Sequence, residues 1–362
     1  MPRRYGEPAT GHHRGGLVVT HRWTTAPLLL LLAACAQGSH PVACTADRDT
    51  TRGSRTVELR IDHHQHLLSE GARAVTVTNF RTIGDTSYAR KAEHEPLVDA
   101  ARMVRMLDEA GIAKALVFSN AYYFAHPAIE QAGEYEQVRA ENDWTLAQVR
   151  RHPARLFAAC SVNPRRGYAV AEIERCAASG GFRALKLHFG GSGVDLGDPT
   201  HVAGVRRAFA AANRLRLPVV AHLRSEAEFG ARQARTFLGE ILPAAPDVPV
   251  TINHLWGGGR YGPDADSALS VFAHSFERMD PRVGNLWFDL AQIYMAPPTD
   301  NDRARIAEQM RRIGFARMLY GSDGPQWGGV PPRQHWEEFK KCMPLTGGEL
   351  DTIAANVAPY LR

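Results

Sequence analysis

A short histidine-rich segment, Asp62-His63-His64-Gln65-His66, is the first place in this sequence where residue types and spacing could do chemistry. Side chains of an extended backbone alternate between two faces, so Asp62, His64 and His66 are expected to project together. His63 and Gln65 are expected to point the other way. Two imidazoles side by side at a strand end are suitable ligands for a transition metal. The competing interpretation is a pair of histidines on a surface loop.

Further histidine and aspartate residues end other apolar runs. His222 follows Pro218-Val219-Val220-Ala221, His254 ends the run from Val248, and Asp323 follows Met318-Leu319-Tyr320-Gly321-Ser322. Any one of them could be an ordinary buried polar side chain with a hydrogen-bond partner. A converging set is harder to explain as structure alone, because burying unpaired polar groups is costly.

The elements that must position these residues alternate along the chain. Strand-like runs are predicted at residues 57–61, 115–118, 156–162, 184–188, 218–222, 248–254, 286–290 and 318–323. Helical spacing of apolar residues is predicted between them, at 97–107, 137–151, 170–177, 202–215, 237–241 and 306–313. Alternating strands and helices imply a parallel sheet.

Eight such units over this length favour an α/β fold of the closed (β/α)8 TIM barrel type. The alternative is an open doubly wound sheet, but no Gly-x-Gly-x-x-Gly motif follows the first strand. In a barrel, the carboxyl ends of all strands face one shared site. The histidines and the aspartate that end four of the strands are therefore expected to meet.

Three imidazole nitrogens and one carboxylate oxygen, from His64, His66, His222 and Asp323, would suit one divalent metal. Zn²⁺ is the expected ion, with Mn²⁺, Fe²⁺ or Co²⁺ as alternatives. Such an ion can lower the pKa of a bound water to about 7. Asp323 could then accept the proton, and His254 could polarise the substrate or stabilise an oxyanion.

These residues resemble the amidohydrolase superfamily, in its amidohydrolase-2 branch, which includes aminocarboxymuconate-semialdehyde decarboxylase-like enzymes. The matching features are Asp62-x-His64-x-His66, His222, His254, Gly321-Ser322-Asp323-Gly324-Pro325, the stretch 142–157 and the closing segment 345–361. The resemblance covers residues 57–361. It implies that His64, His66 and His222 are metal ligands, that Asp323 is both ligand and proton acceptor, and that His254 is catalytic.

Two positions depart from the family pattern or bear on the number of metals. Leu223-Arg224 follows His222 where the decarboxylases often have Pro-Trp, which weighs against decarboxylation. Lys186 stands where some superfamily members use a carboxylated lysine to bridge two metals, but in this branch the lysine is more often not a ligand. Lys186 and Arg224 are the candidate substrate-binding residues; Arg224 could bind a carboxylate or form a surface salt bridge.

The first 55 residues do not read as part of the fold. Residues 1–35 are predicted to be an export signal, because basic residues precede an apolar run too short to span a bilayer. Leu32-Ala33-Ala34-Cys35 resembles a bacterial lipobox, with an ordinary cleaved signal as the alternative. Residues 36–55 suit a flexible tether, and 56–362 form the barrel domain. The predicted location is the periplasm or cell envelope, with a lipid anchor as the only membrane attachment.

Composition is that of an ordinary globular protein, with 44% hydrophobic and 22% charged residues. The formal net charge of +5 is partly carried by the first 34 residues, and no basic stripe with interleaved aromatic residues follows. Nucleic acid is therefore not an expected partner. The five cysteines lack Cys-x-x-Cys spacing, so neither a zinc ribbon nor a redox pair is predicted.

The leading functional hypothesis is a metal-dependent hydrolase that cleaves an amide, ester or lactone of a small molecule. The first alternative is a non-oxidative decarboxylase or hydratase of a small carboxylic acid, acting on the same metal site. The second is a non-catalytic lipoprotein that keeps the barrel as a binding module. An oligomer is compatible with the sequence.

Overall fold

The computed structural model describes residues 59–129, 132–224, 229–295, 299–326 and 329–362. The predicted export signal, its Cys35 and the tether lie outside the described residues. Within the described ranges, no helix has the length and apolar character needed to cross a membrane.

Eight parallel strands are arranged in sequence order around a barrel. Backbone hydrogen bonds close it: the His63 amide donates to the Tyr320 carbonyl, and the Asp323 amide donates to the His64 carbonyl, both at 2.9 Å. The fold is therefore the predicted (β/α)8 barrel. The strands are β1 (Ile61–His66), β2 (Lys114–Phe118), β3 (Leu156–Ser161), β4 (Phe182–His188), β5 (Val219–His222), β6 (Val250–Ile252), β7 (Leu286–Asp289) and β8 (Met318–Leu319).

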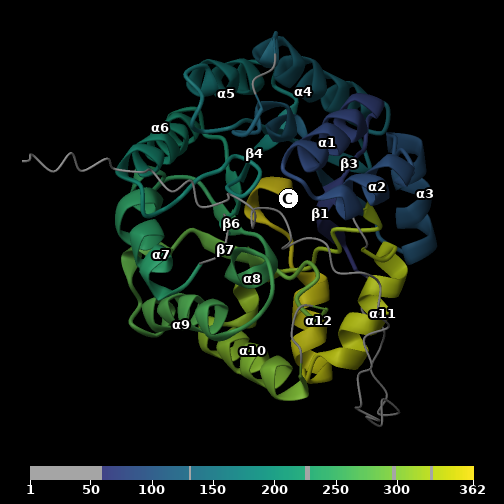
Figure 1. Cartoon of the computed structure of the whole chain (residues 1–362). Coiled ribbons are helices and arrows are strands. Elements are labelled where there is room, and N and C mark those ends of the chain that lie inside the picture. Colours follow the sequence, from purple (N-terminus) through teal and green to yellow (C-terminus); the bar gives the residue numbers. More distant parts are fainter. Residues whose placement is uncertain (1–58, 130–131, 225–228, 296–298, 327–328) are drawn as a thin grey trace, which may run out of the picture.

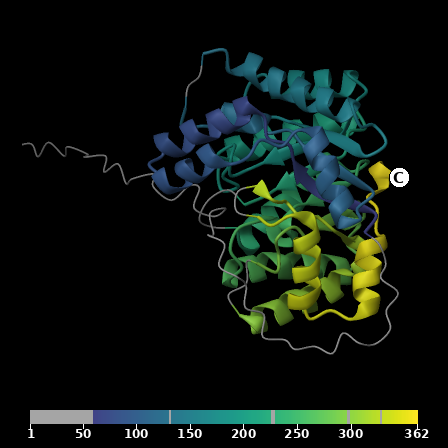
Figure 2. The same ribbon diagram turned by 90° about the vertical axis from the view of Figure 1, so that its right-hand side faces the viewer.

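Helices form a ring outside the strands, as the view along the barrel in Figure 1 and the side view in Figure 2 show. Helices α1, α2, α8, α9 and α11 are not among the predicted elements, and β1 continues to His66, beyond the predicted run 57–61. The helices are α1 (Glu70–Thr82), α2 (Thr86–His94), α3 (Ala100–Ala110), α4 (Glu134–Arg150), α5 (Ala169–Ala178), α6 (Pro199–Arg214), α7 (Ala231–Thr236), α8 (His254–Gly257), α9 (Pro263–Glu277), α10 (Asp300–Ile313), α11 (Pro332–Cys342) and α12 (Gly347–Ala355).

Helix α3 shows how local sequence sets these elements. The Asp99 side chain accepts a hydrogen bond from the Arg102 amide at 2.8 Å and so caps the first turn. Met103 and Leu107 are one turn apart, and both are fully buried against the barrel. Gly111 ends the helix with a φ of 69°, a left-handed conformation that glycine adopts without steric cost.

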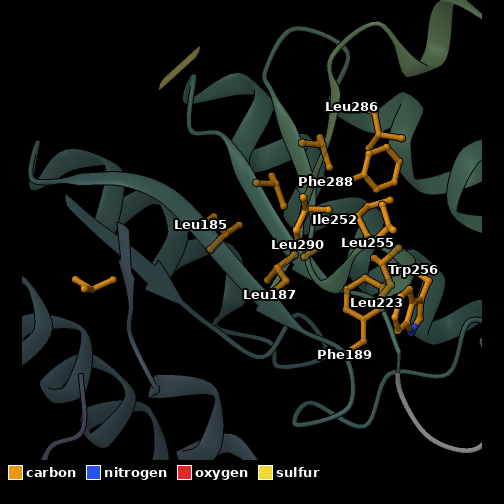
Figure 3. Close-up of a cluster of buried hydrophobic side chains, with 14 of the residues drawn as sticks. Leu185, Leu187, Phe189, Leu223, Ile252, Leu255, Trp256, Leu286, Phe288 and Leu290 are labelled. Carbon is orange, nitrogen blue, oxygen red and sulfur yellow. The ribbon is translucent and has the colours of Figure 1, made fainter. Parts of the chain in front are cut away.

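Alternating side chains of the strands divide the core into two parts. Leu185 and Leu187 of β4 belong to the large cluster between strands and helices, part of which is shown in Figure 3. Ala184 belongs to a smaller cluster that also holds Leu361 near the chain end. Lys186 lies two residues further along and is completely buried. Because side chains two apart share a face, β4 directs Lys186 toward the interior of the barrel.

The last residues of the chain close this interior. The turn η7 (Pro359–Leu361) contacts β4 and lies near the centre of the barrel in Figure 1. His63 joins it to the rest of the fold: its Nδ1 donates to the Tyr320 carbonyl at 2.9 Å, and its Nε2 accepts from the Ala358 amide at 3.2 Å. Burial lowers the pKa of His63 to about 4, so the ring is neutral and can make both bonds. His63 thus faces away from the other histidines, as predicted.

Candidate metal centre

The first strand is irregular at the histidine-rich segment. Its register with β2 shifts between Asp62 and Gln65. The Asp62 carboxylate accepts hydrogen bonds from Gln65 Nε2 at 2.8 Å and from Ser322 Oγ at 2.6 Å. The prediction that Asp62 and Gln65 point to opposite faces is therefore wrong, because the bulge breaks the strict alternation. Burial raises the pKa of Asp62 to about 6 despite these hydrogen bonds.

His64 is oriented by a carboxylate from a neighbouring part of the barrel. Its Nδ1 lies 2.9 Å from Oδ2 of Asp289, the last residue of β7. Asp289 also accepts hydrogen bonds from the Asn253 side-chain amide and, at 2.8 Å, from the His254 backbone amide. Burial alone would raise the pKa of Asp289, but His64 and His254 outweigh it and hold the pKa below its usual range. The carboxylate therefore accepts the Nδ1 proton and leaves the Nε2 lone pair of His64 available.

His66 and His254 have the same tautomer for similar reasons. His66 Nδ1 lies 2.9 Å from Oδ1 of Asn120. The Asn120 amide group donates to the Leu67 carbonyl at 2.7 Å, which fixes Oδ1 as the acceptor for His66. His254 Nδ1 lies 2.9 Å from the Ala291 carbonyl, which can only accept. Both rings therefore carry hydrogen on Nδ1 and present an Nε2 lone pair.

The three Nε2 atoms face one carboxylate. Asp323 Oδ1 lies 3.4 Å from Nε2 of His64 and 3.8 Å from that of His66, and Oδ2 lies 3.7 Å from that of His254. With Nδ1 protonated, each Nε2 carries a lone pair close to carboxylate oxygens that also carry lone pairs. A divalent cation among these atoms removes the repulsion, and nitrogen and carboxylate ligands are those that zinc or manganese accepts. The residues present therefore fit a divalent metal.

Ligand atoms of His64, His254 and Asp323 all lie within 4.8 Å of one another. Burial raises the pKa of Asp323 to about 8, since its charged form is poorly solvated there. A cation would supply the missing stabilisation of the carboxylate. His254, predicted to be catalytic rather than a ligand, lies as near Asp323 as His66 does.

Strained backbone surrounds this group. His254, Leu255, Gln292 and Asp323 all have φ between 52° and 58°, an uncommon left-handed conformation for residues other than glycine. Gln292 Nε2 donates to the Asp323 carbonyl at 2.8 Å, and the Asp323 amide donates to the His64 carbonyl. These bonds hold the carboxylate in its position despite the strain, which is typical of functional sites.

His222 lies in the same group of rings. It is buried at the end of β5, its ring centre 4.9 Å from that of His254 and 4.1 Å from that of His188. Gly258 lies against it: a Cβ built on this glycine would be 2.2 Å from His222 Nε2. Gly258 therefore packs directly against the ring nitrogen that would bind a metal. The role of His222 as a ligand stays a prediction.

The two candidate substrate-binding residues are held by protein groups. Lys186 is completely buried, and its ammonium donates to Oδ1 of Asn253 and lies 4.5 Å from the Phe118 ring centre. Arg224 donates from Nη1 to the Arg260 carbonyl at 3.2 Å. A substrate contact by either residue stays a prediction.

Several residues that support the site are not predicted from the sequence. Asp289 was assigned only to a strand end, although a carboxylate after an apolar run was the same signal that identified Asp323. Asn120 and Asn253 gave no signal, because asparagine at a strand end is common in turns. The sequence places His188 at the end of a strand and predicts no role for it.

Comparison with known families identifies the class of protein. The model of the amidohydrolase family (amidohydrolase-2) matches residues 61–351. The chain therefore belongs to this family, in agreement with the resemblance of its strand-end residues. No curated protein matches the chain.

Solved structures share the fold at low sequence identity. 5-Carboxyvanillate decarboxylase from Sphingomonas paucimobilis has a TM-score of 0.59 and 15% identity, covering 83% of this chain and 97% of its own. 5-Carboxyvanillate decarboxylase from Novosphingobium aromaticivorans, complexed with manganese and 4-hydroxy-3-methoxy-5-nitrobenzoic acid, has a TM-score of 0.56 and 14% identity. The match covers 84% of this chain and 96% of that enzyme. A probable 2-pyrone-4,6-dicarboxylic acid hydrolase from Acinetobacter baumannii, with citric acid bound, has a TM-score of 0.50 and 16% identity. The match covers 81% of this chain and 95% of that protein.

Family and geometry together support an enzyme fold with a divalent metal site. One similar structure is complexed with manganese, whereas zinc is the ion predicted from the sequence of this protein. The nitrogen and oxygen donors around Asp323 accept either ion. Which of the two this protein uses stays a prediction.

Proposed function

We propose that this protein is a metal-dependent hydrolase that cleaves an amide, ester or lactone of a small molecule. The observation that carries the proposal is the approach of three Nε2 atoms, from His64, His66 and His254, to the carboxylate of Asp323 at 3.4–3.8 Å. Neutral imidazoles and a carboxylate are the donor set of catalytic metal sites that activate water. We further propose His222 as a ligand, from its position at the end of β5 beside His254.

A divalent cation held by these residues would supply Lewis-acid activation of water and of a substrate oxygen. Asp323 is placed to take the proton of the attacking water, because its carboxylate faces the histidines and is partly exposed. Lys186 lowers the pKa of Asp323 through its charge and so opposes the effect of burial. The buried lysine therefore helps to keep Asp323 in the ionised form that accepts a proton.

The histidine supports keep the site ready for this chemistry. Asp289, Asn120 and the Ala291 carbonyl each occupy one Nδ1, so no ring can turn its lone pair away without losing a buried hydrogen bond. Such preorganisation lowers the reorganisation needed during reaction.

The second candidate function is non-oxidative decarboxylation of a small carboxylic acid at the same site. Its support is that two of the similar structures are 5-carboxyvanillate decarboxylases that cover most of this chain. In this reaction a protonated Asp323 would donate its proton to the carbon that loses carbon dioxide. The electron pair of the broken carbon–carbon bond would form the new carbon–hydrogen bond.

One set of measurements tests both candidates. Purified protein is analysed for metal, stripped with a chelator and reloaded with Zn²⁺ or Mn²⁺, then assayed on ester, lactone, amide and carboxylic-acid panels in H₂¹⁸O. Hydrolysis predicts one ¹⁸O in the product acid. Decarboxylation predicts the release of carbon dioxide and no ¹⁸O in the remaining organic product. Less than about half an equivalent of metal, with no activation by added metal, would contradict both.

We also propose that the protein is exported and anchored by a lipid on Cys35, on the basis of the apolar run that ends in Leu32-Ala33-Ala34-Cys35. The Cys35→Ser variant of the full chain should move from the membrane fraction to the soluble fraction. Equal membrane recovery of both forms would contradict the lipid anchor.

A further inference from the structure

His188, at the carboxyl end of β4, has the opposite tautomer from its neighbours. The backbone amide of Gly191 donates to His188 Nδ1 at 2.9 Å. An Nδ1 that accepts cannot carry hydrogen, so the neutral ring has its hydrogen on Nε2. His64, His66 and His254 present lone pairs from Nε2, whereas His188 presents a donor.

The ring of His188 is fixed between two others. It stacks on His222, with ring centres 4.1 Å apart and an angle of 16° between the ring planes. It also stacks on Tyr122, with ring centres 4.8 Å apart and an angle of 24° between the planes. Gly191 allows this packing, because a Cβ there would lie 2.8 Å from a ring carbon of Tyr122. The stack and the turn that follows β4 therefore keep His188 from rotating.

The other ring nitrogen of His188, Nε2, is not engaged by the described part of the chain. Within the described ranges it has no hydrogen-bond partner, and the residue is half-buried rather than closed off. Its partner in the stack, His222, is itself next to His254, so His188 borders the group around Asp323.

We propose that His188 is a substrate-binding residue that donates its Nε2 hydrogen to a negatively charged oxygen of the substrate. The proposal rests on the proposed function in that the substrate lies beside the metal centre. A donor at this place holds an anionic oxygen next to a cation without competing for the metal, because an Nε2 that carries hydrogen cannot be a ligand. Hydrogen bonds to charged groups are stronger than those between neutral groups, so His188 selects for substrates that carry such an oxygen.

The test uses small probes, because the substrate is unidentified. Acetate and its neutral relative acetamide are titrated into the manganese-loaded protein, and binding is followed by the paramagnetic relaxation of the methyl protons. The His188→Phe variant keeps a flat ring for the stack but has no donor, and His188→Gln restores a donor. His152→Phe, a half-buried histidine beyond α4, is the matched control.

We expect His188→Phe to weaken acetate binding about tenfold or more and acetamide binding about twofold or less. His188→Gln should recover most of the acetate affinity, and His152→Phe should change neither. An equal loss for both probes in His188→Phe, or no acetate binding by the wild-type protein, would overturn the proposal.

Two readouts separate this role from that of a ligand. Metal content of His188→Phe should equal that of the wild-type protein, and a loss of about half or more would show that His188 binds the metal. In the zinc-loaded protein, ¹⁵N chemical shifts should show His188 with hydrogen on Nε2; hydrogen on Nδ1 would overturn the proposal. These measurements need no turnover, so they stand or fall separately from the assays for hydrolysis and decarboxylation.

Discussion

The carboxylate of Asp289 lies 2.9 Å from Nδ1 of His64, although the two residues are 225 positions apart in the chain. The same carboxylate also receives the backbone amide of His254. One buried aspartate at the end of β7 therefore sets the orientation of His64 on β1 and of the segment after β6 that carries His254.

Replacing this aspartate should weaken metal binding without removing a ligand. We expect Asp289→Asn to bind Zn²⁺ or Mn²⁺ about 10- to 100-fold more weakly, because His64 loses the acceptor that fixes its tautomer. Metal titration with a chelator competitor measures this, and circular dichroism checks the fold. Asp351→Asn, on helix α12, is the control. Unchanged affinity in a folded Asp289→Asn protein would show that the pair is not needed for the site.

Asp323 should be essential for turnover but not for folding. We expect Asp323→Asn to reduce kcat by about 100-fold or more, since an amide cannot take a proton from water. The far-ultraviolet spectrum should be unchanged, because the backbone bonds from the Asp323 amide and carbonyl remain. A folded variant with more than about a tenth of the wild-type kcat would remove Asp323 from the proposed role.

Gly258 tests whether the surroundings of His222 matter. A Cβ at this position would lie 2.2 Å from His222 Nε2, and its φ of 111° is also unfavourable for alanine. We expect Gly258→Ala to lower metal content and activity together. Gly239→Ala is a matched control, because a Cβ there meets no atom within 4 Å and needs no positive φ. Equal metal content in both variants would mean that His222 can move without consequence for the metal.

Glu141 predicts a dependence of stability on pH away from the metal centre. Its Oε2 accepts from Ser69 Oγ at 2.7 Å, while the buried Oε1 has no partner in the described part of the chain. Burial raises the pKa of Glu141 from 4.5 to about 7. Between these pH values the native state binds more protons than the unfolded chain. Protonation of Glu141 therefore stabilises the folded state; this stabilisation is complete below pH 4.5 and is lost as the pH rises through about 7.

Glu141→Gln removes the charge while keeping the shape. We expect the variant to gain stability relative to the wild-type protein at pH 8 and to gain less at pH 5, as measured by urea midpoints. Glu136→Gln, exposed on the same helix, should show no such difference between the two pH values. A gain at pH 5 as large as at pH 8 would mean that Glu141 does not titrate in this range.

The barrel could be predicted from the sequence because each strand is an apolar run that a helix-forming stretch follows. The alternation of residues 57–61 predicts the body of the first strand there and only its end at the histidine-rich segment. In the structure the polar residues are themselves the strand, and each is buried with a partner. Hydrogen bonding within the barrel overrides local hydrophobic pattern here.

Strand-end position was enough to suggest that His64, His66, His254 and Asp323 meet, but not how they meet. Asp289 on β7 reaches His64 on β1 past the intervening strand β8, and that pairing depends on register, which no local pattern contains. The sequence also does not predict which ring nitrogen of each histidine carries hydrogen. The turn after β4 makes His188 a donor, whereas Asn120 makes His66 an acceptor at Nε2, and both outcomes follow only from neighbours in space.

The contact of His63 with Ala358 has a practical consequence for handling the protein. Leu361 is buried, and Ala358, at the start of the turn that carries it, is bonded to the first strand. Any segment joined directly after Arg362 would therefore start one residue beyond the packed side chain of Leu361. Such an attachment needs a spacer long enough to leave the interior, or it will pull the last turn out and open the inside of the barrel to water.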